Sequence, residues 1–272
     1  MMDTPKLLIR CAEALDGDLA PGDVEALARW HAEAAPRARD LTGQLVASEA
    51  AAWPEAILCH RAHTHPWYGY LAECSDIDCF AAFMLENRYF PAFLPMLDKI
   101  RGVQICDRGR QAVDDNIADE HVPVPHNQLM ARLMEAVRNE GSPNLTLSLY
   151  PSLIDRTLVF YYGYFCAPWH LVGSLFATEL MGVHRVTQMG IGLRRLGIAE
   201  HDLGFIAIHS QCDDEHARQW REGVILPSIA RAPQLKRIMA AGIAECLDSS
   251  ARYLDDLLSR TTPQQRRAAL RP

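Results

Sequence analysis

Apolar residues recur at helical spacing through nearly the whole chain, and no alternating Val, Ile and Thr run is long enough to build a sheet. This pattern predicts an all-α fold. We expect helices over the ranges 21–34, 38–60, 77–98, 148–164, 168–196, 199–224 and 233–260, and a further helical region over 107–139.

Three of these ranges carry end signals. Ser75-Asp76-Ile77-Asp78 offers a polar N-cap and an acidic first turn. Asn139-Glu140-Gly141-Ser142-Pro143 combines a glycine stop with a proline beyond it, and Gly197 is placed to end the helix before it. Because no fixed-period repeat or linker divides the chain, we expect one helical bundle over 63–260. We expect residues 1–62 to form an N-terminal helical addition packed on this bundle, and residues 261–272 to form a frayed tail.

Composition narrows the classes of function. The 272 residues carry a formal net charge of −7, which disfavours nucleic-acid binding. No apolar stretch approaches the length of a membrane span, and the short run at Leu7–Ile9 is interrupted by Arg10, so neither a span nor a secretory signal is expected. The eight cysteines form no CxxC pair and are typical of buried thiols in a cytoplasmic protein.

The segment Ile208–Arg218 contains the most informative spacing. His209, Asp213 and His216 stand at offsets of zero, four and seven, which places them in one stripe on a helix. Apolar Phe205 and Trp220 extend the same stripe, so it is expected to face inward, where ionisable groups need partners or a metal. Imidazole together with carboxylate suits iron, manganese or zinc. The alternative is a solvated helix face with no metal.

A second signal is Glu179, a carboxylate on the apolar face of its predicted helix. A lone buried glutamate is costly, so either metal coordination or an ion pair with an arginine such as Arg185 is expected. His170 and His184 lie about 180° and 140° around the helix from Glu179, and are therefore left out of this site.

The third signal is the segment Asn116–Asn127. Asp119 and His126 would align on a straight helix, but Pro123 and Pro125 should bend or interrupt it. Spacing does not choose between Asp119 and Glu120 as the ligand, and a turn with incidental charges is the alternative.

The other segments of the sequence do not indicate a further catalytic or ligand-binding site. Cys59–Trp67 is rich in histidine, but its proline and mixed spacing are more typical of a loop that leads into a helix. Nucleotide-binding glycine motifs, the serine-hydrolase elbow and the ExxH signature of ferritin-like di-iron bundles are absent from the sequence.

The three signals, in this order, resemble the haem-oxygenase-like di-iron oxidases and oxygenases, also called iron-containing redox enzymes. The matched residues are Glu120 (or Asp119) with His126, then Glu179, then His209, Asp213 and His216. The segment HSQCDDEHARQW is especially similar to the branch that forms alkenes by fatty-acid decarboxylation. The first motif departs from the family pattern, because DEHVPVPH lacks the usual glycine after the acid.

The resemblance implies an up-and-down helical bundle that holds two iron ions through three histidines and three carboxylates and uses dioxygen as co-substrate. We expect oxidative C–C or C–heteroatom cleavage, or N-oxygenation, of a small amino-acid-derived metabolite in natural-product biosynthesis, with an external electron donor. Formation of a terminal alkene from a fatty acid, a thiaminase-like hydrolase with a nucleophilic cysteine, and a non-catalytic metal- or haem-binding protein are the alternatives.

Arg185, Arg194 and Arg195 are candidate anchors for a substrate carboxylate, because guanidinium offers a bidentate fork. Arg194 and Arg195 precede Gly197, where basic side chains also serve the helix dipole. The first sixty residues are expected to cover the substrate entrance or to mediate formation of a homodimer.

Overall fold

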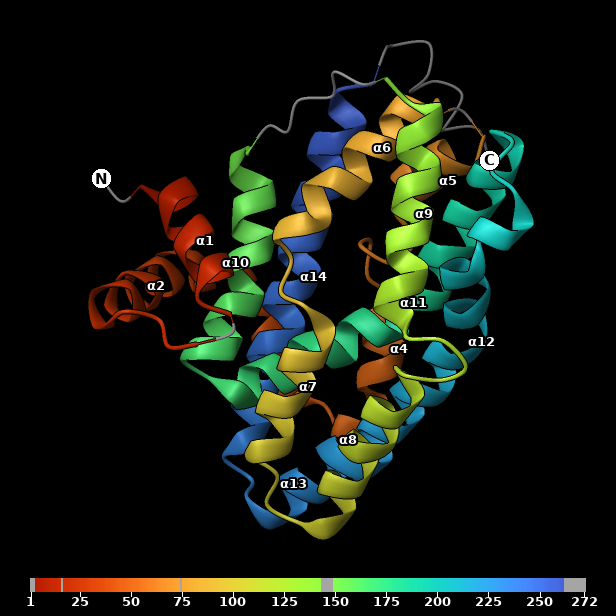
Figure 1. The fold of residues 1–272 in the computed structure, drawn as a ribbon. Coiled ribbons are helices and arrows are strands. Elements are labelled where there is room, and N and C mark those ends of the chain that lie inside the picture. Colours follow the sequence, from red (N-terminus) through yellow and green to blue (C-terminus); the bar gives the residue numbers. More distant parts are fainter. Residues whose placement is uncertain (1–2, 16, 74, 143–148, 262–272) are drawn as a thin grey trace.

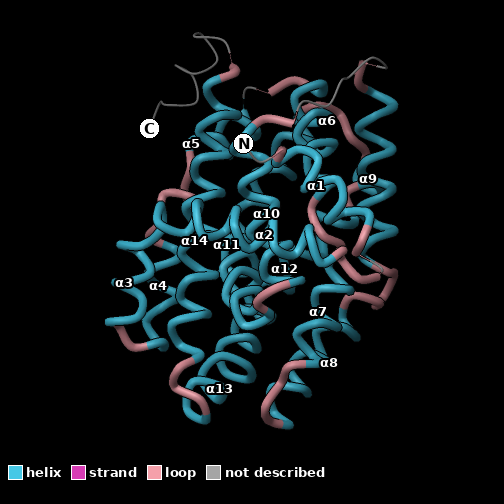
Figure 2. Tube along the Cα trace, turned by 90° about the vertical axis from the view of Figure 1, so that its left-hand side faces the viewer, coloured by secondary structure: helices cyan, strands magenta, loops and turns pink. Residues whose placement is uncertain are grey.

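The computed structural model describes residues 3–15, 17–73, 75–142 and 149–261. Every regular element within these ranges is helical and none is a strand (Figure 2). The longer helices run along one elongated bundle (Figure 1). The all-α fold class predicted from the periodicity is confirmed for the residues that the structure describes.

The centre of the bundle is α11 (Pro168–Arg195), which contacts α10 (Pro151–Phe165), α12 (Gly204–Gln219) and α14 (Leu235–Ser259). Around these lie the shorter helices α1 (Thr4–Glu13), α2 (Pro21–Ala34), α3 (Arg39–Ala47), α4 (Trp53–Leu58), α5 (Pro66–Glu73), α6 (Ile77–Glu86), α7 (Phe93–Gly102), α8 (Asp107–Asp119), α9 (His126–Glu140) and α13 (Leu226–Arg231). Short 3₁₀ turns connect several of them, and a π-helical segment, Trp220–Ile225, continues α12.

Three predicted helical ranges are each divided in two, and a proline lies in or shortly after each break. The range 38–60 stops at Ala47 and resumes in α4, where Pro54 occupies the first turn. The range 77–98 breaks around Pro91, and 107–139 breaks between α8 and α9 over the segment that contains Pro123 and Pro125. A proline ring removes a backbone donor and clashes with the preceding turn. The continuous helices predicted over 38–60 and 77–98 were wrong, whereas the interruption of 107–139 at Pro123 and Pro125 agrees with the prediction that these prolines bend or interrupt the segment.

The other boundaries follow the sequence signals more closely. The Asp76 side chain accepts a hydrogen bond from the Cys79 backbone N–H at 2.8 Å, which makes it the predicted N-cap of α6. Gly197 follows the end of α11 with φ of 87°, a conformation that glycine adopts without steric cost. Helices α1, α5 and α13 had not been predicted.

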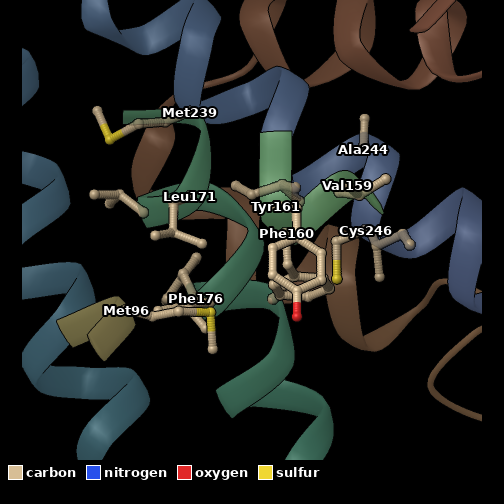
Figure 3. Packing of buried hydrophobic residues seen from close by; sticks show 14 of the residues in the cluster. Met96, Val159, Phe160, Tyr161, Leu171, Phe176, Met239, Ala244 and Cys246 are labelled. Carbon is tan, nitrogen blue, oxygen red and sulfur yellow. The ribbon is translucent and has the colours of Figure 1, made fainter. Parts of the chain in front are cut away.

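Helices α11 and α14 approach each other closely at two glycines. A Cβ atom at Gly173 would lie 2.0 Å from the carbonyl oxygen of Met239, and one at Gly242 would lie 2.0 Å from that of His170. Only glycine permits this backbone separation. Figure 3 shows the apolar packing beside the crossing, where Leu171 and Phe176 of α11 lie close to side chains of α10 and α14.

The first sixty residues contribute to the same core. Leu7 of α1 and Leu27 of α2 are fully buried and belong to the hydrophobic cluster that contains Leu158 and Leu171. Both helices pack against α10 (Figure 1). Apart from Thr261, the predicted frayed tail lies outside the described residues. No helix in the described ranges combines the length and apolar character needed to cross a membrane.

Candidate metal centre

The three residues of the HxxxDxxH spacing lie on α12. Asp213 and His216 are buried, and His209 is half-buried. The His209 Nδ1–H donates a hydrogen bond to the carbonyl oxygen of Phe205 at 2.9 Å. This bond fixes the tautomer and leaves Nε2 with a free lone pair, which is the arrangement that metal-binding histidines commonly adopt.

Glu179 meets this stripe from α11. It is only 6% exposed, and one of its carboxylate oxygens lies 3.7 Å from Nδ1 of His216. Gly182, one turn further along α11, leaves room for Asp213, because a Cβ atom there would lie 2.0 Å from Oδ2 of Asp213. The two helices therefore bring two carboxylates and two imidazoles into one buried space.

The chain reversal between α8 and α9 supplies the remaining candidates. Glu120 ends α8 and His126 begins α9, and a backbone hydrogen bond of 3.0 Å from the His126 N–H to the Glu120 carbonyl joins them. The ligand atoms of Glu120, His126 and His209 all lie within 4.8 Å of one another. Interruption of the helix by the prolines thus places the acid beside the histidine.

Asp119 and Glu120 occupy different environments. Glu120 is buried, with a carboxylate oxygen 3.2 Å from Nδ1 of His126. The Asp119 side chain is 54% exposed, and its Oδ2 lies 3.4 Å from Nε2 of His216. Glu120 faces the core of the site and Asp119 borders it on the solvent side.

The donor set fits a metal ion. Both ring nitrogens of His126 and Nε2 of His216 are buried without a hydrogen-bond partner, even though a carboxylate oxygen lies within ion-pair distance of His126 Nδ1 and another of His216 Nε2. Unpaired buried polar atoms cost free energy, and metal coordination would compensate for them. Imidazole nitrogens and carboxylate oxygens are suitable ligands for iron.

The electrostatics of the site point the same way. Burial raises the pKa of the Glu120 and Asp213 carboxyls, and the charge of Glu179 raises both further. Burial lowers the pKa of His209 to about 4, so its imidazole is neutral at pH 7. Burial disfavours charge on His216 as well, but Glu179 raises the pKa of this imidazole to about 9. The carboxylates of Glu120, Glu179 and Asp213 repel one another when they are ionised together, and a bound cation would relieve this repulsion.

The three candidate arginines are placed differently. Arg194 pairs with Glu200 at 2.7 Å, and Arg195 donates to the carbonyl oxygen of Ala72 at 2.9 Å. Both lie roughly 22 Å or more along α11 from Glu179 at the usual helical rise. Arg185 is half-buried and makes no hydrogen bond or ion pair with any described residue, and its charge lowers the pKa of Asp213.

Other candidate side chains are engaged elsewhere. His65 lies 3.1 Å from Asp255 and accepts from the backbone N–H of Trp67 at 3.1 Å, while His63 packs against His184. Cys212 borders the site, but burial raises the pKa of its thiol to about 12. A protonated thiol is a poor nucleophile and a poor ligand.

A family model described as "Iron-containing redox enzyme" matches residues 78–251, which is more than half of the chain. The chain belongs to this haem-oxygenase-like family. The matched region contains every residue of the candidate centre, and the membership makes the chain an oxidoreductase of an iron-containing class. No curated protein matches the chain.

Two residues around the site were not singled out from the sequence. Gly182 leaves space for the Asp213 carboxylate, and its only sequence signal is a small residue three positions after Glu179. Asn116 is 1% exposed with both amide atoms unpaired, one helical turn before Glu120. A polar residue on the buried face of α8 was the signal that could have found it.

We predict that Gly182→Ala lowers the iron content of the protein by half or more without unfolding it, because the added methyl group displaces the Asp213 carboxylate. Metal analysis after ferrous loading, together with far-UV circular dichroism, measures both effects. Gly69→Ala on α5 is the matched control, since nothing lies within 4 Å of a Cβ atom there. Equal iron contents in the two variants would contradict the assignment.

We also predict that ferrous affinity rises with pH between about pH 6 and 8. The raised pKa values mean that Asp213 and His216 hold protons at low pH, and a metal must displace them. Each displaced proton contributes about tenfold in affinity per pH unit below its pKa. Anaerobic calorimetry in buffers of different ionisation enthalpy counts the protons released, and a pH-independent affinity without proton release is the opposing result.

Proposed function

We propose that this chain is a non-haem di-iron enzyme that uses dioxygen to oxidise a small amino-acid-derived metabolite in a biosynthetic pathway. The reaction is oxidative C–C or C–heteroatom cleavage, or N-oxygenation. One observation carries the proposal. Six ligand-type side chains, three histidines and three carboxylates, converge from α9, α11, α12 and the end of α8: Glu120, His126, Glu179, His209, Asp213 and His216.

The residues divide the work between them. Glu120, Glu179 and Asp213 would supply negative charge that balances two divalent ions, and carboxylates can change denticity as the charge on iron changes. The bond from His209 to Phe205 would hold one imidazole in its binding orientation. Bound iron would supply the activation of dioxygen, and an external electron donor would provide reducing equivalents.

The substrate class rests on Arg185. Arg185 is half-buried, lies close enough to Asp213 and His209 to affect the pKa of both, and makes no hydrogen bond or ion pair with a described residue. A guanidinium whose donors are not engaged, beside a reactive centre, is suited to bind a carboxylate bidentately. This favours a substrate that keeps an amino-acid carboxylate over one whose recognition depends on an alkyl chain.

The proposal is tested by anaerobic ferrous titration of the metal-free protein followed by rapid mixing with oxygen. We expect about two iron ions per chain and a transient visible absorption that amino acids accelerate more than fatty acids. Glu179→Gln, which keeps the side-chain shape, should bind at most about one. Acceleration by fatty acids would instead favour formation of terminal alkenes. Absence of ferrous binding, or a Soret band after haem addition, would favour a non-catalytic binding protein.

For Arg185→Ala we expect the Michaelis constant for the amino-acid substrate to rise by about tenfold or more while the iron content stays unchanged. The cause is loss of the guanidinium that faces the substrate carboxylate. Steady-state oxygen consumption measures it, with Arg138→Ala, an exposed arginine on α9, as the control. An unaltered Michaelis constant would remove Arg185 from the substrate site.

A further inference from the structure

A second cluster of ligand-type side chains lies in the core, formed by His31 of α2, His170 of α11 and Glu245 of α14. Nε2 of His31 lies 3.1 Å from the Glu245 carboxylate, and Nε2 of His170 lies 3.2 Å from the same group. One ligand atom from each of the three residues can be chosen so that all lie within 4.8 Å of one another. We name this the His31 cluster.

The His31 cluster is separate from the candidate metal centre. His170 precedes Glu179 by nine residues on α11, which corresponds to about 14 Å along the helix, and the two residues point to nearly opposite sides. His31 also lies outside the region that the family model matches. The cluster therefore joins the N-terminal helices to the matched bundle.

The close crossing of α11 and α14 positions two of the three residues, His170 and Glu245. Gly242 allows the α14 backbone to approach the carbonyl of His170, and the Ser174 hydroxyl donates to the Gly242 carbonyl at 3.1 Å. His170 lies one turn before Ser174 and Glu245 one turn after Gly242, so both side chains emerge at the crossing point. Their separation is fixed by backbone contact between two long helices.

The third residue, His31, is positioned by contacts of α2 with α10. The indole N–H of Trp30 donates to Asp155 of α10 at 3.1 Å, which anchors α2 beside the cluster. The His31 ring stacks on Tyr162, with centroids 3.5 Å apart and planes at 5°. The His31 side chain is 18% exposed, whereas those of His170 and Glu245 are 2% and 7% exposed. His31 is therefore the most solvent-exposed member of the cluster.

The chemistry of the three groups matches a small divalent ion. Two imidazoles and one carboxylate are a common three-ligand set for zinc, with water as the fourth ligand. In a tetrahedral site with bonds of about 2.0–2.1 Å, ligand atoms lie about 3.3 Å apart, close to the two distances from an imidazole nitrogen to the Glu245 carboxylate. Although burial opposes ionisation, hydrogen bonding to His170 and His31 lowers the pKa of Glu245 to about 2, so its carboxylate is anionic at neutral pH.

We propose that His31, His170 and Glu245 form a second metal site, which binds one divalent transition ion of the zinc class and fastens α2 to α11 and α14. The site is independent of the oxygen chemistry proposed above. A bound ion would bridge segments far apart in the sequence, so metal should stabilise the folded chain against unfolding.

Cobalt titration of a chain that lacks the first centre tests the proposal. In the full-length variant His126→Ala/His209→Ala/His216→Ala, which removes every imidazole of the first centre, we expect one Co²⁺ per chain with the visible bands of a tetrahedral site, displaced by Zn²⁺. Adding His31→Ala or Glu245→Gln should weaken this binding by about a hundredfold or more. Asp248→Asn, one turn along α14 from Glu245, removes a charge outside the cluster and should leave the binding unchanged.

A second measurement covers the case in which the background variant does not fold. In the otherwise unaltered chain, zinc bound per chain should fall by one on His31→Ala, and the rise in thermal midpoint on zinc addition should fall with it. No cobalt bound by the folded background variant, or equal zinc contents and equal midpoint shifts with and without His31, would overturn the proposal. The cluster would then be a hydrogen-bonded contact between helices. Neither result depends on whether the first centre reacts with oxygen.

Discussion

The burial of carboxylates inside an all-helical core is the constraint on which the rest of this structure depends. Glu120, Glu179 and Asp213 are each less than one tenth exposed. An isolated buried carboxylate costs several kcal/mol, comparable with the whole net stability of a typical domain. Histidines surround these groups, and protons or cations must balance their charge. The four helices α8, α9, α11 and α12 are therefore arranged so that their buried carboxylates meet imidazoles and can share a cation.

Helix α11 sets the positions of both clusters. It carries Glu179 toward α12 on one side and His170 toward α14 on another, and its unbroken course over residues 168–195 keeps these positions in register. Glycines on the same helix set the distances to its neighbours. Gly182 admits the side chain of Asp213, and Gly173 admits the backbone of α14. A larger residue at either place would separate groups that have to meet.

The two clusters draw their residues from different parts of the chain. All residues of the first centre lie within the region that defines the family, whereas the second includes His31 from the N-terminal helices. Those helices share a hydrophobic core with the bundle through Leu7 and Leu27. Burial of apolar side chains holds the N-terminal helices against the bundle. The polar contact of His31 with Glu245 fixes which residues of α2 and α14 face each other.

The sequence by itself determined the fold class and the identity of the candidate ligands, because both depend on local spacing. Residues seven apart share a helix face whatever surrounds them, so the spacing alone is enough to group His209, Asp213 and His216. The apolar face around Glu179 and the segment from Asp119 to His126 supplied the other candidates, and the resemblance assembled the three signals into one site and placed the chain in the correct family.

Tertiary structure alone decided what depends on contacts between distant segments. The choice between Asp119 and Glu120 as the group facing the core follows from how the reversal at the prolines packs, which spacing cannot encode. His170 faces away from Glu179, and this same direction brings it to His31 and Glu245. Helical periodicity reports the face on which a side chain lies, but only packing reports what it meets there.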